Sequence, residues 1–292
     1  MANFETSGGG FLMALIQLKL YSATLKTRTN VNVIIPTVLP PADGLTKRCH
    51  EFDEFYETHG KYPVLYLLHG TYGDEGDWVR YSRIEDYARQ YNVVVVMPSC
   101  ENSCYKNTTA GKDYEVYITR ELPKMIQWMF PVSKRREDTF IGGLSMGGGG
   151  AVRLGLSHQD IYGCTIGLSA DLGMTPRLIE DNEFTVWSHA FDREQPVKGT
   201  VFDSKWLADQ AMGYSGEHTK LYIACGTEDF LYQENCNFHE YMNKIGFNHV
   251  FSTSEGNHNW NFWDSEIFKV LKWLPVTSMN RQPIRISDKK EK

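Results

Sequence analysis

The pentapeptide Gly143–Gly147 (Gly-Leu-Ser-Met-Gly) constrains the fold of this chain more than any other stretch. It matches the pattern G-x-S-x-G and directly follows the apolar, strand-like run 138–142. A strand that turns sharply into a helix at a serine needs small residues on both sides, because Cβ atoms there would clash with the backbone. The alternative is a glycine-rich helix start that merely packs close to a strand. The helix-like run 151–156 favours the strand–turn–helix reading, with Ser145 as an exposed nucleophile.

A nucleophilic serine in this setting requires an acid and then a histidine later in the chain. Asp229 stands in a loop after the strand-like run 220–225, and His258 stands in a Gly-flanked loop after the run 249–253. Sheets of this kind keep their sites at the carboxyl ends of such strands. Asp229 is therefore the predicted acid and His258 the predicted base. An ordinary turn aspartate and a structural histidine are the alternatives, and Glu228 is the rival carboxylate.

The oxyanion hole is expected to take one N–H from an early strand-to-helix loop and one from the residue after the nucleophile. The apolar run 64–68 ends in His69-Gly70-Thr71. Gly70 allows the loop to turn, so the predicted donors are the amides of Thr71 and Met146. His69 precedes the nucleophile in the chain and lies at a strand end, which favours a role in bracing the loop over a role as the base.

Three motifs carry a resemblance to a known family: Leu67-Leu68-His69-Gly70, Gly143-Leu144-Ser145-Met146-Gly147-Gly148 and His258-x-Trp260. With them the chain resembles the esterase D and feruloyl esterase group of α/β-hydrolases, and within it bacterial tributyrin and cinnamoyl esterases. The resemblance runs from about Met13 to about Leu274. It implies Ser145 as nucleophile, Asp229 as acid, His258 as base, and Thr71 and Met146 as oxyanion donors.

The chain departs from this family pattern in two places. Family members often carry a serine or glycine before an aromatic residue, after the strand that ends in Met-Pro, and here Cys104 precedes Tyr105. The interval 171–216 does not align with the family, although it should shape the substrate pocket. Its length and its aromatic residues favour an ordered cap-like insertion over the site, with a satellite core under a loop as the alternative.

Alternating strands and helices predict the architecture. The runs 17–21 and 30–35 alternate polar and apolar residues, as in an antiparallel pair with one wet face. Strands then interleave with helices, which predicts the α/β class and the α/β-hydrolase fold, a mostly parallel central sheet with helices on both faces. The expected strands lie near 63–68, 92–97, 138–142, 162–168, 220–225 and 249–253, and the expected helices near 82–90, 113–129, 147–157, 232–245 and 264–273.

A chain of 292 residues can hold one such domain with a full core. It is expected to divide into a leader-like segment at 1–12, an α/β-hydrolase domain at 13–277 and a tail at 278–292. The first ten residues contain no Lys or Arg, unlike a secretory signal, and no stretch reaches the roughly 20 apolar residues of a membrane span. A cytoplasmic protein without a membrane partner is therefore expected.

Charge and cysteine content restrict the partners. The net charge of −6 gives no basic footprint for nucleic acid. The six cysteines show no second ligand pair at zinc spacing, so neither a metal nor an organic cofactor is expected. Free thiols are the expected state, with a local disulfide between Cys100 and Cys104 as the alternative.

Together these features predict a serine carboxylesterase that acts through an acyl-enzyme on short-chain acyl (acetyl, butyryl) or hydroxycinnamoyl (feruloyl) esters, acylated saccharides among them. Trp78, Tyr105 and Trp260 are expected on loops at the rim of the site, where they stack on a sugar or phenolic ring or serve ordinary packing. An S-formylglutathione hydrolase is the alternative, followed by an acyltransferase and a non-catalytic binding protein on a hydrolase scaffold. The sequence leaves homo-oligomerisation open.

Overall fold

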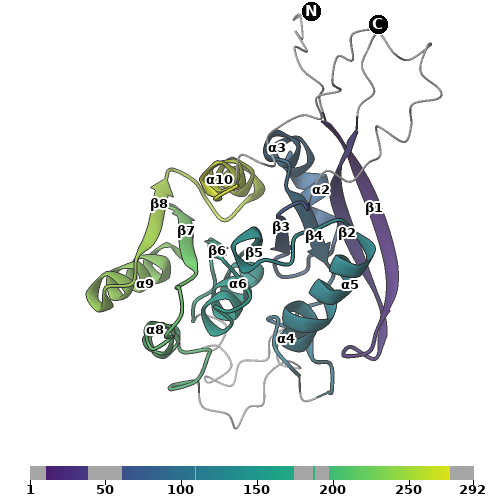
Figure 1. The fold of residues 1–292 in the computed structure, drawn as a ribbon. Coiled ribbons are helices and arrows are strands. Elements are labelled where there is room, and N and C mark those ends of the chain that lie inside the picture. The colour runs from purple at the N-terminus through teal and green to yellow at the C-terminus, as the bar shows by residue number, and fades with distance from the viewer. Residues whose placement is uncertain (1–10, 39–60, 109, 174–186, 188–196, 277–292) are drawn as a thin grey trace, which may run out of the picture.

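The computed structural model describes residues 11–38, 61–108, 110–173, 187 and 197–276 (Figure 1). The strands in these residues are β1 (Phe11–Ser22), β2 (Thr27–Val38), β3 (Val64–Leu68), β4 (Val94–Pro98), β5 (Thr139–Leu144), β6 (Cys164–Leu168), β7 (Lys220–Gly226) and β8 (His249–Ser254). They form one sheet in the order β1-β2-β4-β3-β5-β6-β7-β8. Strands β3 to β8 run parallel, whereas β2 pairs antiparallel with both β1 and β4. The predicted mostly parallel sheet is confirmed.

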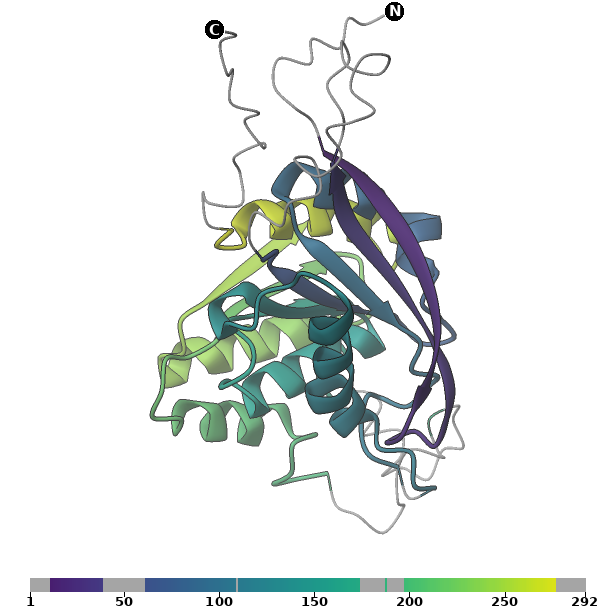
Figure 2. The same cartoon turned by 45° about the vertical axis from the view of Figure 1, so that its right-hand side comes forward.

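Helices cover both faces of this sheet (Figures 1 and 2). They are α2 (Asp77–Tyr81), α3 (Ile84–Tyr91), α4 (Tyr114–Val116), α5 (Leu122–Met129), α6 (Met146–Ser157), α8 (Ser204–Met212), α9 (Tyr232–Ile245) and α10 (Trp260–Trp273). Because side chains alternate along a strand, Leu65 and Leu67 of β3 pack toward α2, α3 and α10, while Tyr66 and Leu68 pack toward α4, α5 and α6. Both faces of the central strands are therefore apolar, as the continuous apolar runs indicate.

The first two strands are longer than the alternation in the sequence predicts. Strand β1 pairs with β2 along its whole length, from Phe11 opposite Val38 to Ser22 opposite Thr27. The last two residues of the expected leader, 11 and 12, therefore belong to the sheet. Residues 1–10 and the tail from 277 onward lie outside the described residues, as do 174–186 and 188–196 of the expected cap-like insertion.

The helix expected at 113–129 is divided by a π-helical turn, Tyr117–Glu121. Pro123 lies in the first turn of α5 and cannot donate a backbone hydrogen bond, which favours such a widened turn just before it. The Glu121 carboxylate accepts hydrogen bonds from the Ser22 hydroxyl and the Ala23 amide, at 2.6 and 2.7 Å. The widened turn thus ties this helical segment to the β1–β2 connection.

The strand order reverses between β3 and β5. From β3 the chain moves outward to β4, and it then returns to place β5 on the other side of β3. Open α/β sheets bind their ligands outside the carboxyl ends of the strands at such a switch point. The loop that follows β3 and the turn that follows β5 meet there, and these segments carry Thr71 and Ser145.

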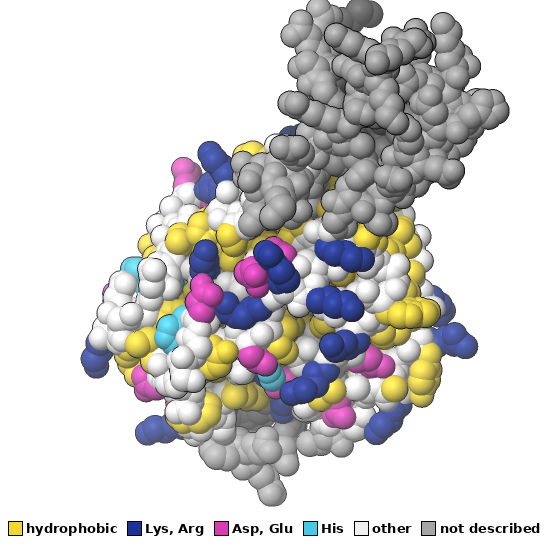
Figure 3. All heavy atoms as spheres, viewed as in Figure 1, with side chains coloured by type: hydrophobic (Ala, Val, Ile, Leu, Met, Phe, Trp, Pro, Cys, Tyr) yellow, Lys and Arg dark blue, Asp and Glu magenta, His cyan; other side chains and the backbone are white. Residues whose placement is uncertain are grey.

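One face of the molecule carries charges of both signs (Figure 3). Figure 3 shows a short column of Lys and Arg side chains on one face, with Asp and Glu side chains beside it, so the charge on this face is mixed. Within the described part of the chain, no helix has the length and apolar character to cross a membrane. The same residues contain no group of three or more His, Cys, Asp or Glu side chains that could hold a metal ion.

Candidate active site

Ser145 stands between β5 and α6 with backbone angles of φ 55° and ψ −121°, a conformation that L-residues rarely adopt. Its amide donates to the carbonyl oxygen of Leu168 at 2.9 Å, and its carbonyl oxygen accepts from the Gly149 amide at 2.9 Å. A Cβ added at Gly147 would lie 2.4 Å from the carbonyl oxygen of His69. Glycine is therefore required here because the first turn of α6 packs directly on the loop after β3.

His258 connects the serine to a carboxylate. Its Nε2 lies 2.9 Å from Ser145 Oγ, and its Nδ1 lies 2.9 and 3.0 Å from the two carboxylate oxygens of Asp229. The carboxylate only accepts hydrogen bonds, so Nδ1 carries the proton and Nε2 is free to accept from the serine hydroxyl. The edge of the ring meets Trp263 at a centroid distance of 4.9 Å, and Phe230 packs against it at 4.5 Å.

The Asp229 side chain is fully buried at the carboxyl end of β7. Burial raises the pKa of this carboxyl, but hydrogen bonds from His258, the Leu231 amide and Ser169 outweigh burial and hold the pKa below its ordinary value. Ser169 follows β6 directly and also accepts from Trp263 Nε1 at 3.0 Å. Sequence reasoning missed Ser169, whose only signal is its place at a strand end beside β5.

The rival carboxylate points elsewhere. Glu228 is exposed and accepts a hydrogen bond from Asn257 Nδ2 at 2.9 Å. Its neighbour Asp229 is the carboxylate that meets His258. The side chains of these two successive residues in the turn after β7 therefore point in different directions.

The loop after β3 lies against the serine. A Cβ added at Gly70 would lie 2.6 Å from Leu144 Cδ1 and 3.5 Å from Ser145 Cβ. His69 is buried in this loop, where its Nε2 accepts from the Cys100 amide at 3.0 Å and its Nδ1 lies 2.7 Å from the carbonyl oxygen of Gly70. Both ring nitrogens of His69 are thus engaged within the loops.

The structure corrects the expected rim of aromatic side chains. Trp78 and Tyr105 are 1% and 0% exposed, because the indole N–H and the phenol find backbone carbonyl partners inside the protein. The prediction that these two rings border the substrate is therefore wrong. Trp260 is half-buried and packs edge-on against Trp78 and Trp263.

Two other aromatic residues are exposed beside the site. Tyr72 is 79% exposed and directly follows Thr71, and Phe230 is 65% exposed and packs on the ring of His258. Sequence reasoning missed both residues, although each directly follows a predicted site residue.

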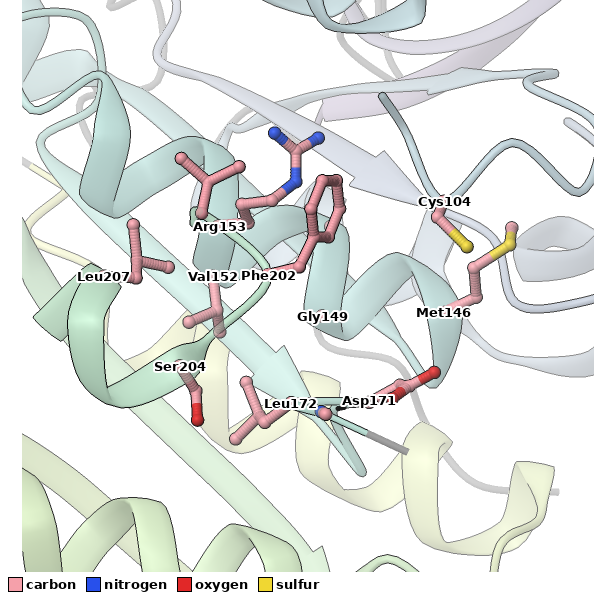
Figure 4. Close-up of a pocket in the computed structure, with 13 residues that line it drawn as sticks. Cys104, Met146, Gly149, Val152, Arg153, Asp171, Leu172, Phe202, Ser204 and Leu207 are labelled. Atoms are coloured by element: carbon pink, nitrogen blue, oxygen red, sulfur yellow. Dashed lines mark hydrogen bonds between the residues drawn. The ribbon is translucent and has the colours of Figure 1, made fainter. Parts of the chain in front are cut away.

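A hollow begins at Met146, the residue after Ser145 in the chain, and follows one side of α6 (Figure 4). Cys104, Met146 and Asp171 lie at one end of it, and Val152, Arg153, Phe202 and Leu207 lie toward the other. Apolar side chains predominate in the lining, which suits an uncharged substrate group.

Cys100 and Cys104 are free thiols, so the alternative of a local disulfide does not hold.

The sequence of this chain is similar to those of known esterases. Residues 52–274 match the Esterase family, described as "Putative esterase". An acetyl esterase of Caldicellulosiruptor saccharolyticus is 31% identical over 274 residues, which cover 91% of this chain and 100% of that protein.

Two solved structures from Staphylococcus aureus are also similar. The fluorophosphonate-binding serine hydrolase FphF, with substrate bound, aligns at a TM-score of 0.80 and 32% identity over 90% of this chain and 98% of its own. The S-formylglutathione hydrolase FrmB aligns at 0.77 and 32% over the same shares. The chain therefore belongs to this esterase family, has the α/β-hydrolase fold and is a carboxylic ester hydrolase.

Proposed function

We propose that this protein is a serine carboxylesterase in which Ser145 is the nucleophile, His258 the general base and Asp229 the orienting acid. The observation that carries the proposal is the continuous chain of hydrogen bonds from Ser145 Oγ through both ring nitrogens of His258 to the buried Asp229. Ser145 Oγ attacks the ester carbonyl carbon while His258 Nε2 takes its proton. The resulting imidazolium is stabilised by the Asp229 carboxylate, then protonates the departing alcohol, and water repeats the cycle on the acyl-enzyme.

The amides of Thr71 and Met146 are the proposed oxyanion donors. Met146 is the first residue of α6, where the first backbone N–H groups have no partner inside the helix. Thr71 follows Gly70, which lies against Ser145. One such donor typically lowers the activation barrier by about 3–4 kcal/mol, because it is already aimed at the oxygen that becomes charged.

The hollow beside Met146 supports short acyl groups as substrates. Its free space is about 40 Å³, room for about three water-sized groups. An acetyl or butyryl chain is small enough for this space. The similarity to an acetyl esterase points in the same direction. On the alcohol side, Tyr72 and Phe230 offer exposed rings on which a saccharide ring can stack.

An S-formylglutathione hydrolase is the second candidate, favoured by the similarity to FrmB. Its substrate is a thioester whose thiol part carries two carboxylates. Lys106 and Arg153 both lie against the Phe202 ring, at 5.3 and 5.1 Å, but both cations are buried. Buried cations do not offer their charge to the carboxylates of such a substrate. The esterase proposal therefore predicts higher kcat/KM for 4-nitrophenyl acetate than for S-formylglutathione.

Two measurements test the proposal. Mass spectrometry after treatment with a fluorophosphonate probe should place the adduct on Ser145 and find none in the Ser145→Ala variant. A series of 4-nitrophenyl esters from acetate to octanoate should show kcat/KM falling beyond butyrate. Labelling at another residue would refute the nucleophile, and a maximum at octanoate would refute the acyl-chain assignment.

A further inference from the structure

Three consecutive carbonyl groups at the end of β3 each meet a donor from a buried side chain. Trp78 Nε1 donates to the carbonyl oxygen of Leu68 at 3.1 Å. The Tyr105 hydroxyl donates to that of His69 at 2.7 Å, and His69 Nδ1 lies 2.7 Å from that of Gly70. His69 belongs to this stretch itself, whereas Trp78 and Tyr105 follow it in the chain. All three side chains are buried and leave no contact surface for a substrate. Their shared feature is the stretch of backbone that they hold.

The protonation state of His69 follows from its second contact. The Cys100 amide can only donate, so Nε2 of His69 accepts and carries no proton. The ring proton therefore resides on Nδ1 and is donated to the carbonyl oxygen of Gly70. Burial lowers the pKa of His69, which keeps the ring in this neutral form.

The bond to Gly70 controls the direction of the next amide. The Gly70 carbonyl and the Thr71 N–H belong to one planar trans peptide, in which C=O and N–H point in opposite directions. The Gly73 amide also donates to the Gly70 oxygen, at 3.2 Å, and the shorter contact of 2.7 Å is the one from His69. Donors held on the Gly70 oxygen therefore fix where the Thr71 N–H points. The donors on the His69 and Leu68 oxygens fix the two preceding peptide planes in the same way.

We propose that His69, Tyr105 and Trp78 are positioning residues that aim the Thr71 amide at the oxyanion, through the three carbonyl groups at the end of β3. The inference rests on the proposed function, because it takes Thr71 as an oxyanion donor. Tyr105 and Trp78 thus act through the backbone rather than by contact with the substrate.

The backbone around Tyr105 supports this role. Cys104 and Tyr105 have φ values of 49° and 56°, a left-handed conformation that is unfavourable for both residues and persists only where the surroundings hold it. Arg153 Nη2 donates to the Tyr105 carbonyl oxygen at 2.5 Å. A Cβ added at Gly150 would lie 2.6 Å from the Tyr105 ring, so α6 packs closely on this side chain. The phenol is therefore held in one place by α6.

The first test compares two buried tyrosines. Tyr162 is also fully buried and donates to a backbone carbonyl, that of Ile118 at 3.1 Å, in the π-helical turn Tyr117–Glu121, which contains no proposed site residue. Tyr105→Phe should lower kcat for 4-nitrophenyl acetate by about tenfold with KM unchanged, since a shifted donor loses part of its transition-state stabilisation. It should weaken binding of a trifluoromethyl ketone, which forms an oxyanion on the serine, by the same factor. Tyr162→Phe should change neither value.

The second test separates the two nitrogens of His69. The side-chain amide of Asn reaches the position of Nδ1, and that of Gln reaches the position of Nε2. His69→Asn can keep the donor to Gly70, whereas His69→Gln can keep only the acceptor for the Cys100 amide. His69→Asn should therefore retain higher kcat than His69→Gln. If Tyr105→Phe does not fold, the comparison of the two His69 variants still tests the inference.

Two results would overturn the inference. One is equal ketone affinity in Tyr105→Phe, Tyr162→Phe and wild type; the other is equal or lower kcat in His69→Asn than in His69→Gln. Failure of the proposed function shows differently, as absence of a fluorophosphonate adduct on Ser145 in the wild-type protein.

Discussion

Replacing Asp229 by Asn tests the proposed site most sharply, because the substitution changes hydrogen-bonding capacity with little change in shape. The carboxylate accepts from His258 Nδ1 and from the Leu231 amide at 2.9 Å each. In the Asp229→Asn variant one of the two oxygens becomes an NH2 group, which must face either the imidazole or the buried Leu231 N–H. Two opposed buried donors cost about 1–3 kcal/mol, whereas the neutral imidazole can move its proton to Nε2. The amide therefore turns its NH2 group toward the imidazole.

The consequence is the wrong tautomer of His258. A proton on Nε2 points at Ser145 Oγ, so the ring can no longer accept the serine proton. We expect kcat to fall about 10⁴-fold, or about 5 kcal/mol of activation free energy. The assay is steady-state hydrolysis of 4-nitrophenyl acetate, with circular dichroism to confirm that the variant is folded.

The neighbouring carboxylate supplies the control. Glu228 is exposed and its partner is the Asn257 side chain, so Glu228→Gln should leave kcat almost unchanged. A folded Asp229→Asn variant that kept a tenth of wild-type kcat would refute the tautomer argument. A crippled Glu228→Gln variant would move the acid by one residue.

Three further outcomes follow from particular contacts. Ser145→Ala should lower kcat about a millionfold and leave a small residual rate, measured by steady-state kinetics with concentrated enzyme. Gly147→Ala should lower both the urea midpoint of unfolding and kcat, since its Cβ would lie 2.4 Å from a carbonyl oxygen of the loop after β3. Hydrogen bonding to His158, stronger than the opposing effect of burial and joined by the charge of Arg153, lowers the pKa of Glu115 to about 2. This depressed pKa stabilises the fold above the ordinary pKa of Glu, and the stabilisation disappears as pH falls toward 2. Glu115→Gln should therefore destabilise the protein at pH 7 and reduce the loss of stability between pH 5 and pH 2, measured by urea unfolding at each pH.

The parallel part of the sheet could be predicted because its strands leave a local signature. Each of the runs near 64–68, 139–144 and 220–226 contains a short apolar stretch and is followed by small or polar residues. The first two strands have no such local signature. β1 begins with the apolar run 11–16, which does not alternate, and its true length depends on pairing with β2. Neither segment alone determines which residues of the other strand it pairs with.

The candidate site likewise has one part that the sequence predicts and another that only the folded structure reveals. The convergence of Ser145, Asp229 and His258 could be predicted because their order and their places after strands follow from the chain alone. The direction of a buried aromatic side chain does not. Trp78 and Tyr105 lie near the carboxyl edge of the sheet, as the sequence indicates, but their N–H and O–H groups find the carbonyl oxygens of Leu68 and His69 only in the folded protein.

Burial of these aromatic groups and the glycine content of α6 have a common cause. The two proposed oxyanion donors come from different segments, the loop after β3 and the first turn of α6, and they can converge only if these backbones touch. Gly147 permits that contact, since its would-be Cβ lies 2.4 Å from the His69 oxygen. Besides the Gly73 amide, which donates to the Gly70 oxygen at 3.2 Å, side-chain donors on three successive carbonyls hold the peptide planes of the loop. The glycine pattern is visible in the sequence because it is a local requirement. The matching donors are dispersed over more than thirty residues and become recognisable only through the backbone that they hold.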